Sequence, residues 1–166
     1  MKEKLFIPLL FGTNRKGNQS AIAARWLFRE MEKREDIETK FFDASTFTFP
    51  SDDCCGAIKN KFPEYRDAIS LADGLVIIAP EYNHSYPGVL KSILDLLLGE
   101  YAHKAAGLVG VSAGPVGGAR MVEQLVGVCR ELGLVPIKKN IYFSAVQDVF
   151  DGNGNLSRRI PTQNDI

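Results

Sequence analysis

Short apolar runs alternate with stretches of helical periodicity along most of the chain. Such runs predict five strands, at residues 5–11, 37–42, 75–79, 108–112 and within 134–143. The runs at 75–79 and 108–112 lack the polar alternation of a half-exposed strand, which is typical of central strands covered on both faces. Strands that alternate with helices indicate βαβ units. We therefore predict one α/β domain with a parallel sheet over residues 1–150.

The segments between these runs predict helices. They are expected from about Asn18, over residues 62–72, after Pro87 and over residues 118–132. Pro87 suits the first helical position, where no N–H is needed, and Gly133 suits the C-terminal cap of the last helix. The expected buried stripes are Ala24, Leu27, Phe28 and Met31 in the first helix, and Val122, Leu125, Val126 and Cys129 in the last. Trp26 is expected to lie outside the first stripe.

The helix after Pro87 is unusually apolar. Between residues 89 and 98, only Lys91, Ser92 and Asp95 are polar. These three positions span about 100° of a helix, so the apolar arc is wider than contact with one sheet requires. We expect the remaining apolar surface to bury against a second subunit.

Residues 151–166 form a C-terminal tail without a convincing helical stripe, so the helix expected after the fifth strand is missing or shortened. Asp151, Asn153 and Asn155 have the alternate spacing of a calcium loop. Leu156, however, stands where that motif requires glycine, and no glutamate closes it. A plain turn is favoured, and no metal site is predicted.

Composition limits the class of partner. The 166 residues carry 20 acidic and 20 basic side chains, so the charge balance indicates neither nucleic-acid binding nor an acidic electron carrier. No apolar stretch reaches transmembrane length, and the run at 5–11 contains Pro8 and lacks a signal-peptide cleavage site. The three cysteines include the adjacent pair Cys54 and Cys55, which is poorly placed for a mutual disulfide. We expect a cytoplasmic protein with a small-molecule partner and no membrane contact; a redox role for the cysteine pair is an alternative to simple burial.

The first candidate ligand loop is the segment 12–20, between the first strand and its helix. Ligands of open parallel sheets collect at this strand end, and a helix N-terminus favours a phosphate. Thr13, Asn18 and Ser20 offer short polar side chains, and Arg15 offers a planar charged fork. The loop matches neither a P-loop nor the GxGxxG fingerprint. An ordinary polar loop capped by Asn18 is the alternative.

The second candidate loop, residues 80–88, follows the third strand. In a sheet of order 2-1-3-4-5, strands 1 and 3 are neighbours at the switch point, so this loop should stand beside the first. Tyr82 and Tyr86 offer flat surfaces for a planar ring, and the segment 83–85 offers donors and acceptors for its edges. Packing is the usual role of such aromatics and remains the alternative.

The third candidate loop, residues 112–118, follows the fourth strand. Its three glycines allow the backbone to approach a ligand closely. A tight turn from strand to helix explains the same residues equally well.

Several of these motifs together resemble the NAD(P)H-dependent FMN reductase family, which includes quinone, azo-dye and chromate reductases. They are Thr-Asn-Arg at 13–15, Ala-Asp at 72–73, Pro-Glu-Tyr-Asn at 80–83, Pro-Gly-Val-Leu-Lys at 87–91 with Asp95, and Ser-Ala-Gly-Pro-Val-Gly-Gly at 112–118. The resemblance implies a flavodoxin-like, doubly wound five-stranded parallel sheet of order 2-1-3-4-5. It also implies non-covalently bound FMN and a homodimer or homotetramer with the flavin near the subunit contact.

The resemblance places Thr13, Arg15, Asn18 and Ser20 on phosphate-binding positions. It places residues 80–83, with Ser112 and Gly114, around the isoalloxazine. The family commonly has Ser and Asn where this chain has Asn18 and Ser20. The full candidate set for the cofactor is Thr13, Arg15, Asn18, Gln19, Ser20, Pro80, Glu81, Tyr82, Asn83, His84, Ser112, Gly114 and Gly117.

The implied activity is that of an FMN-dependent oxidoreductase. Hydride would pass from NADPH or NADH to N5 of the flavin and on to a quinone, azo, metal-ion or flavin acceptor, by a ping-pong scheme. The cofactor carries this chemistry, so no protein nucleophile is required; His84 is more readily a hydrogen-bond partner than a proton donor. A flavodoxin-type electron carrier and an FMN-binding sensor remain alternatives.

Overall fold

The computed structural model describes residues 4–49, 58–157 and 160. The adjacent cysteines Cys54 and Cys55 lie outside the described residues. The strands are β1 (Leu5–Phe6), β2 (Leu9–Phe11), β3 (Ile37–Glu38), β4 (Phe41–Asp43), β5 (Gly74–Pro80), β6 (Ala105–Val111), β7 (Val135–Pro136) and β8 (Ile141–Phe143). The α-helices are α1 (Ser20–Glu32), α2 (Pro63–Leu71), α3 (Gly88–Leu94) and α4 (Ala119–Glu131), with short 3-10 turns η1 (Ala44–Thr46), η2 (Ile58–Lys61), η3 (Gly99–Tyr101) and η4 (Val146–Asp148).

Every pairing between the eight strands of the described chain is parallel. The main sheet has the order β4-β2-β5-β6-β7, and β8 also pairs with β6. β1 pairs with β3, and β2, which follows β1 in the chain, pairs with β4, which follows β3. Taking β1–β2, β3–β4 and β7–β8 each as one interrupted strand gives the order 2-1-3-4-5. The predicted doubly wound parallel sheet is therefore confirmed.

Three of the five expected strands are interrupted. In the first, the break falls at Pro8, which has no N–H for a ladder. Hydrogen bonds resume on both sides, since the N–H groups of Ile7 and Leu9 donate to Glu38 and Lys40 over 2.8 Å each. β1 and β2 therefore run in the same direction and pair with the same neighbouring strand, which is divided into β3 and β4.

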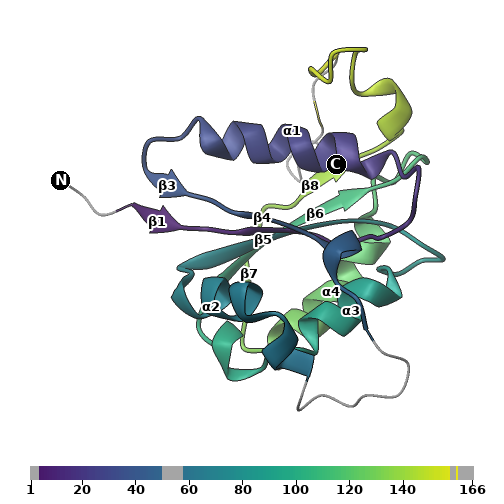
Figure 1. Cartoon of the computed structure of the whole chain (residues 1–166). Helices are drawn as coiled ribbons and strands as arrows, with labels where there is room; N and C mark the ends of the chain where they lie inside the picture. Colours follow the sequence, from purple (N-terminus) through teal and green to yellow (C-terminus); the bar gives the residue numbers. More distant parts are fainter. Residues whose placement is uncertain (1–3, 50–57, 158–159, 161–166) are drawn as a thin grey trace.

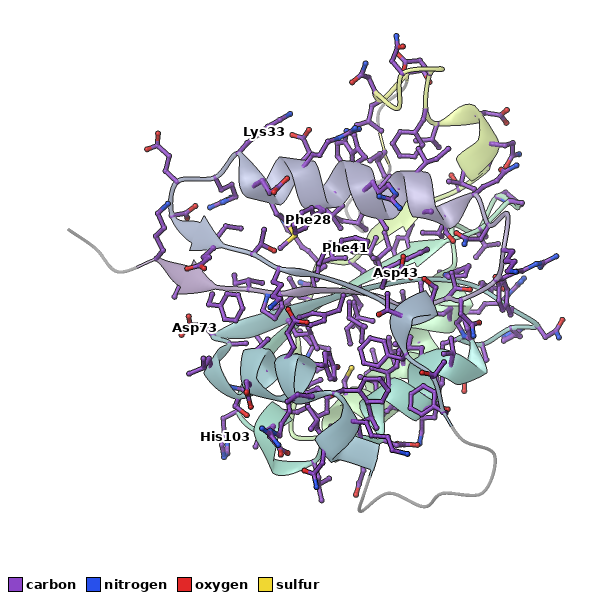
Figure 2. All side chains as sticks on the ribbon, viewed as in Figure 1. Phe28, Lys33, Phe41, Asp43, Asp73 and His103 are labelled. Carbon is purple, nitrogen blue, oxygen red and sulfur yellow. The ribbon has the colours of Figure 1, made fainter. Side chains whose placement is uncertain are left out.

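The helices divide unequally between the two faces of the sheet (Figure 1). α2, α3 and α4 cover one face, and α1 covers the other with the segment that follows β8. Each layer is tied to the sheet by buried apolar residues; Figure 2 shows Phe28 of α1 directed toward Phe41 of β4, with ring centroids 5.3 Å apart. This arrangement leaves the carboxyl ends of the central strands free of covering helices.

The expected helical stripes are largely confirmed. The buried residues are Ser20, Ala23, Ala24 and Met31 in α1, and Met121, Val122, Leu125 and Cys129 in α4. Leu27, Phe28 and Val126 are partly buried against the same clusters. Trp26 was expected outside the stripe, but it is partly buried on the same cluster as Leu27 and Phe28, and its ring packs against Phe143 and Phe150 at centroid distances of 6.0 and 6.2 Å. That expectation was wrong.

The segment after β8 partly replaces the expected fifth covering helix. Within residues 144–157, the only helical element is the single turn η4. Phe150 and Leu156 pack against the α1 layer, and Arg29 donates to the carbonyl of Gly154 over 2.8 Å. An apolar groove of about 330 Å³ remains beside α1, with Val76, Val109 and other sheet residues in its floor.

The tail residues 151–155 form a turn. The Asp151 carboxylate accepts the N–H groups of Asn153 and Asn155, each over 2.9 Å. These backbone hydrogen bonds lower the pKa of Asp151. Among the described residues, no group of histidine, cysteine and carboxylate side chains is arranged to hold a metal.

The apolar segment after Pro87 does not form the long helix that was expected. α3 ends at Leu94, and Pro87 is its N-cap rather than its first residue. Because the chain turns after Leu94, Leu96 and Leu97 are buried within the monomer. Of the leucines in this segment, Leu98 is the exposed one, with 67% of its surface accessible. The wide apolar face predicted for subunit contact is therefore absent, and that prediction was wrong. No helix in the described part of the chain has the length and hydropathy to cross a membrane.

α4 ends as the sequence predicts. Gly133 has a φ of +74°, and its N–H donates to Arg130 while Leu134 donates to Cys129 over 2.9 Å. This double hydrogen bond is the Schellman arrangement that favours glycine. The side chain of Cys129 is fully buried, and this burial raises the pKa of its thiol to about 12.

Candidate flavin site

A pocket of about 510 Å³ opens at the carboxyl ends of β2, β5 and β6. Its lining residues come from the three candidate loops and from the segment after β8. They are Arg15, Lys16, Gly17, Asn18, Gln19, Ser20, Pro80, Glu81, Tyr82, Val111, Ser112, Ala113, Val146 and Gln147. The predicted site residues Thr13, Asn83, His84, Gly114 and Gly117 lie outside this lining. The three loops therefore meet, but not every residue in them faces the pocket.

The loop 12–20 is held by side-chain hydrogen bonds. Asn18 Oδ1 accepts the N–H of Ala21 over 2.9 Å and the hydroxyl of Ser20 over 3.0 Å. Its amide group donates to the carbonyl of Arg15 over 2.7 Å. Asn18 thus caps α1, as the ordinary-loop alternative requires, while the same loop forms one wall of the pocket. The capping interpretation is therefore confirmed, and phosphate binding by the same loop stays a prediction.

Tyr82 connects the first two loops. Its hydroxyl lies 3.1 Å from Oγ1 of the buried Thr13, and the Arg15 guanidinium carbon lies 5.7 Å from its ring centroid. One region of the Tyr82 ring is therefore occupied by Arg15. Tyr86 is not part of the pocket lining and is partly buried against the core on the α2–α4 side of the sheet, so its role as a ring platform stays a prediction.

The loop after β5 makes a tight two-residue hairpin. Tyr82 and Ser85 exchange backbone hydrogen bonds of 2.8 and 3.1 Å. The two central residues, Asn83 and His84, have φ values of +50° and +72°. Such a primed turn normally prefers glycine, so the backbone is strained here. The pairing uses the N–H groups of Tyr82 and Ser85, not those of Asn83 and His84.

The loop 112–118 is a tight turn whose glycines are required by protein packing. A Cβ atom on Gly118 would lie 2.5 Å from the nitrogen of Val111, and one on Gly117 would lie 2.8 Å from Cβ of Tyr142. Gly114, by contrast, has open space around it. The tight-turn alternative therefore explains Gly117 and Gly118, and Ser112 and Ala113 are the residues that line the pocket.

The segment after β8 forms a fourth wall, which was not predicted from the sequence. The N–H groups of Ala145 and Val146 donate to Gly114 and Ser112 over 3.0 and 3.1 Å. These bonds place Val146 and Gln147 in the pocket lining. The signal was available, because a fifth parallel strand must also end at this edge of the sheet.

The charges around the pocket are unevenly distributed. Arg15 and Lys16 are exposed on the wall beside the N-terminus of α1. Glu81 lies on the wall that follows β5, and its Oε1 accepts from Nη1 of Arg120 over 3.2 Å. The wall with Arg15 and Lys16 favours an anionic group. The walls that follow β5 and β6 offer backbone and hydroxyl groups.

The residues present fit FMN. A phosphate would find Arg15 and the N-terminus of α1 on one wall, where helix geometry favours anions. The pocket volume lies within the usual range of about 300–1,000 Å³ for small-molecule sites. A planar ring would lie between the hairpin after β5 and the wall formed by Ser112 and Ala113.

Comparison with known proteins gives a consistent result. The family model described as NADPH-dependent FMN reductase matches residues 7–148. A quinone reductase of Escherichia coli K12 is 34% identical over 128 residues, which is 72% of this chain and 66% of that protein. A 2-hydroxy-1,4-benzoquinone reductase of a Burkholderia species is 36% identical over 105 residues, 57% of each chain. The matches thus span about half to two thirds of the length of these curated relatives.

Solved structures support the fold. The flavoenzyme FerB of Paracoccus denitrificans, an NAD(P)H:(acceptor) oxidoreductase, superposes with a TM-score of 0.75 at 22% identity over 93% of this chain and 87% of that one. The apo form of the NADH:FMN oxidoreductase EmoB gives a TM-score of 0.65 at 22% identity, over 86% of this chain and 76% of that one. The flavodoxin-like architecture predicted from the motifs is confirmed.

Proposed function

Because the chain belongs to the NADPH-dependent FMN reductase family, we propose that it binds FMN in this pocket and oxidises NADPH or NADH for the reduction of a small acceptor. The observation that carries the proposal is the position of the pocket. It lies at the carboxyl ends of β2 and β5, between the N-terminus of α1 and the hairpin after β5. This is the switch point at which doubly wound sheets bind their ligands.

The phosphate side of the site is formed by the loop 12–20. Arg15 would contribute a charge-assisted hydrogen bond to the phosphate. Asn18 already caps α1 through Ala21, so its role is to hold the helix end in place for the anion. Ser20 and the first N–H groups of α1 would complete the phosphate site.

The ring side depends on backbone groups. The N–H groups of Asn83 and His84 are not used inside the hairpin, and they would be available to polarise the N5 and O4 edge of the ring. Ser112 and Ala113 would approach the pyrimidine edge. Bound FMN supplies the redox chemistry, accepting a hydride from the nicotinamide and delivering two electrons to the acceptor. The chain itself binds, orients and partly shields the ring.

A purified-protein spectrum tests this proposal directly. We expect a bound-flavin spectrum that bleaches on anaerobic addition of NADPH or NADH, and the released flavin should be FMN by mass spectrometry. FMN is expected instead of FAD because the sequence contains no second glycine-rich fingerprint for an adenylate. A flavin that resists both nicotinamides but accepts single electrons from a partner protein would favour the electron-carrier alternative.

We further propose a ping-pong scheme with quinone-like acceptors. One pocket with one ring-sized space gives donor and acceptor the same place, so they must bind in turn. Double-reciprocal plots at several acceptor concentrations should then be parallel, and excess acceptor should compete with the nicotinamide. Intersecting plots would require a ternary complex and would contradict a shared place. Azo, metal-ion and flavin acceptors are tested in the same assay.

A homodimer or homotetramer in the cytoplasm remains part of the proposal. It is supported by family resemblance alone, because Leu90, Leu94, Leu96 and Leu97 are buried within the monomer and only Leu98 of this segment's leucines is exposed. Light scattering at micromolar concentration measures the state directly. A monomer that still holds and reduces FMN would separate the oligomer from the activity.

A further inference from the structure

An ion pair stands behind the expected position of the flavin ring. Glu81 follows the last residue of β5, and its side chain is 11% exposed. Its Oε1 accepts from Nη1 of Arg120 over 3.2 Å. The other oxygen, Oε2, is buried and has no hydrogen-bond partner among the described residues. The carboxylate is therefore compensated from one side only.

The pair connects two walls of the pocket. Glu81 belongs to the wall that continues into the hairpin, and Arg120 lies in the first turn of α4, directly after the loop 112–118. Among the described lining residues, Glu81 is the acidic one; the cations Arg15 and Lys16 lie in the loop 12–20. No other described lining residue brings a negative charge to the ring side.

The two charges of this pair are screened unequally. The Arg120 side chain is 49% exposed, whereas that of Glu81 is 11% exposed. Water weakens the field of the exposed charge more than that of the buried one, because the effective dielectric constant is higher at the surface. The pair therefore does not cancel inside the pocket.

We propose that Glu81 and Arg120 set the reduction potential of the bound flavin, Glu81 lowering it and Arg120 raising it; this rests on FMN binding as proposed above. Full reduction adds two electrons and one proton, taken up at N5, and leaves one additional negative charge near N1 of the ring. A nearby carboxylate disfavours that charge and a nearby guanidinium favours it. The balance between the two side chains then decides how readily the flavin gives up its electrons.

Three variants test this inference with opposite expected signs. Glu81→Gln keeps the shape of the side chain, removes the negative charge and should raise the potential. Arg120→Gln leaves Glu81 uncompensated and should lower it. For Glu81→Gln the ratio of affinities for reduced and oxidised FMN should change about tenfold, which corresponds to about 30 mV for a two-electron couple. The shift for Arg120→Gln should be smaller, because that side chain is more exposed. The double variant should have a potential between those of the wild type and Glu81→Gln.

The measurement does not depend on turnover. The potential is obtained by reducing the holoprotein with dithionite in equilibrium with a reference dye, and affinities come from titration of the apoprotein with each form of FMN. Arg25→Gln is the matched control, since Arg25 is an exposed cation on α1 outside the pocket. Arg120→Lys keeps the positive charge and should keep the potential. If Glu81→Gln fails to fold, the comparison of Arg120→Gln with Arg120→Lys still tests the effect of charge.

The outcomes separate a charge effect from a purely structural one. If the pair only braced the two walls, both single variants would weaken FMN binding and shift the potential in the same direction, or not at all. Either result would overturn the inference and leave the proposed function intact. A wild-type protein that binds no FMN would overturn both.

Discussion

The loops that follow β2 and β5 lie side by side and shape one pocket, but they are stabilised in different ways. The loop 12–20 is held by the side chain of Asn18, which bonds Ser20, Ala21 and the carbonyl of Arg15. The hairpin after β5 is held by its backbone, with Asn83 and His84 at positive φ. We therefore expect side-chain substitutions in the loop 12–20 to change ligand affinity. In the hairpin, substitutions should change stability according to how well the new residue tolerates a positive φ.

The largest effect is expected in the first loop. Arg15→Ala should weaken FMN binding by about 1.5–3 kcal/mol, the usual contribution of a hydrogen bond to a charged group. Titration of the apoprotein by flavin fluorescence measures it, and Arg25→Ala on α1, outside the pocket lining, is the control. An unchanged dissociation constant would place Arg15 outside the phosphate site. It would also contradict the expectation that side chains of the loop 12–20 determine ligand affinity.

In the hairpin, two substitutions at one position should differ. His84→Val places a β-branched residue at a φ of +72°, which should lower the free energy of unfolding by about 1–2 kcal/mol. His84→Gly removes the strain but gains freedom in the unfolded chain, so its net effect should stay below about 1 kcal/mol. Urea denaturation of both variants checks this. Equal destabilisation by Val and Gly would mean that the imidazole, not the backbone, holds the hairpin.

The smallest effect concerns the contact between the two loops. Tyr82→Phe removes the hydroxyl that lies 3.1 Å from Thr13 Oγ1, and should destabilise the protein by about 0.5–1.5 kcal/mol. FMN affinity should fall only a few-fold, because Arg15 retains a ring to pack against. Tyr86→Phe provides the control within the same segment. A loss of FMN binding as large as that of Arg15→Ala would show that the two loops act as one unit.

The sheet could be predicted from the sequence because its signal is strong. The apolar run at 75–79 lies within β5, and the run at 108–112 extends one residue beyond the end of β6. The alternation of strands and helices predicted the parallel sheet, and the family resemblance supplied its strand order. The breaks within the first, second and fifth expected strands were not predicted, although Pro8 marks the first of them. Nor was the early end of α3, because the turn after Leu94 buries Leu96 and Leu97 through tertiary packing that no helical pattern contains.

The candidate site was predicted best where side chains form it. Arg15, Asn18 and Ser20 line the pocket as expected. Gly117 was assigned to the ligand because a glycine can serve a turn or a close approach, and only the neighbouring Tyr142 shows which applies. Gln147 was missed because the helical pattern fails after β8 and no local motif marks this segment. The signal was topological, since a fifth parallel strand ends at the same edge of the sheet, and it was not used.

The buried thiol of Cys129 has a chemical consequence. Quinones are electrophiles that alkylate cysteine thiolates, and a reductase that handles them is exposed to this damage. Reactivity requires the thiolate, and burial within α4 raises the pKa of Cys129 to about 12 while keeping its sulfur away from solvent. Cys129, the cysteine in the part of the chain that the structure describes, is therefore protected from arylation by the proposed quinone substrates while its side chain packs in the core.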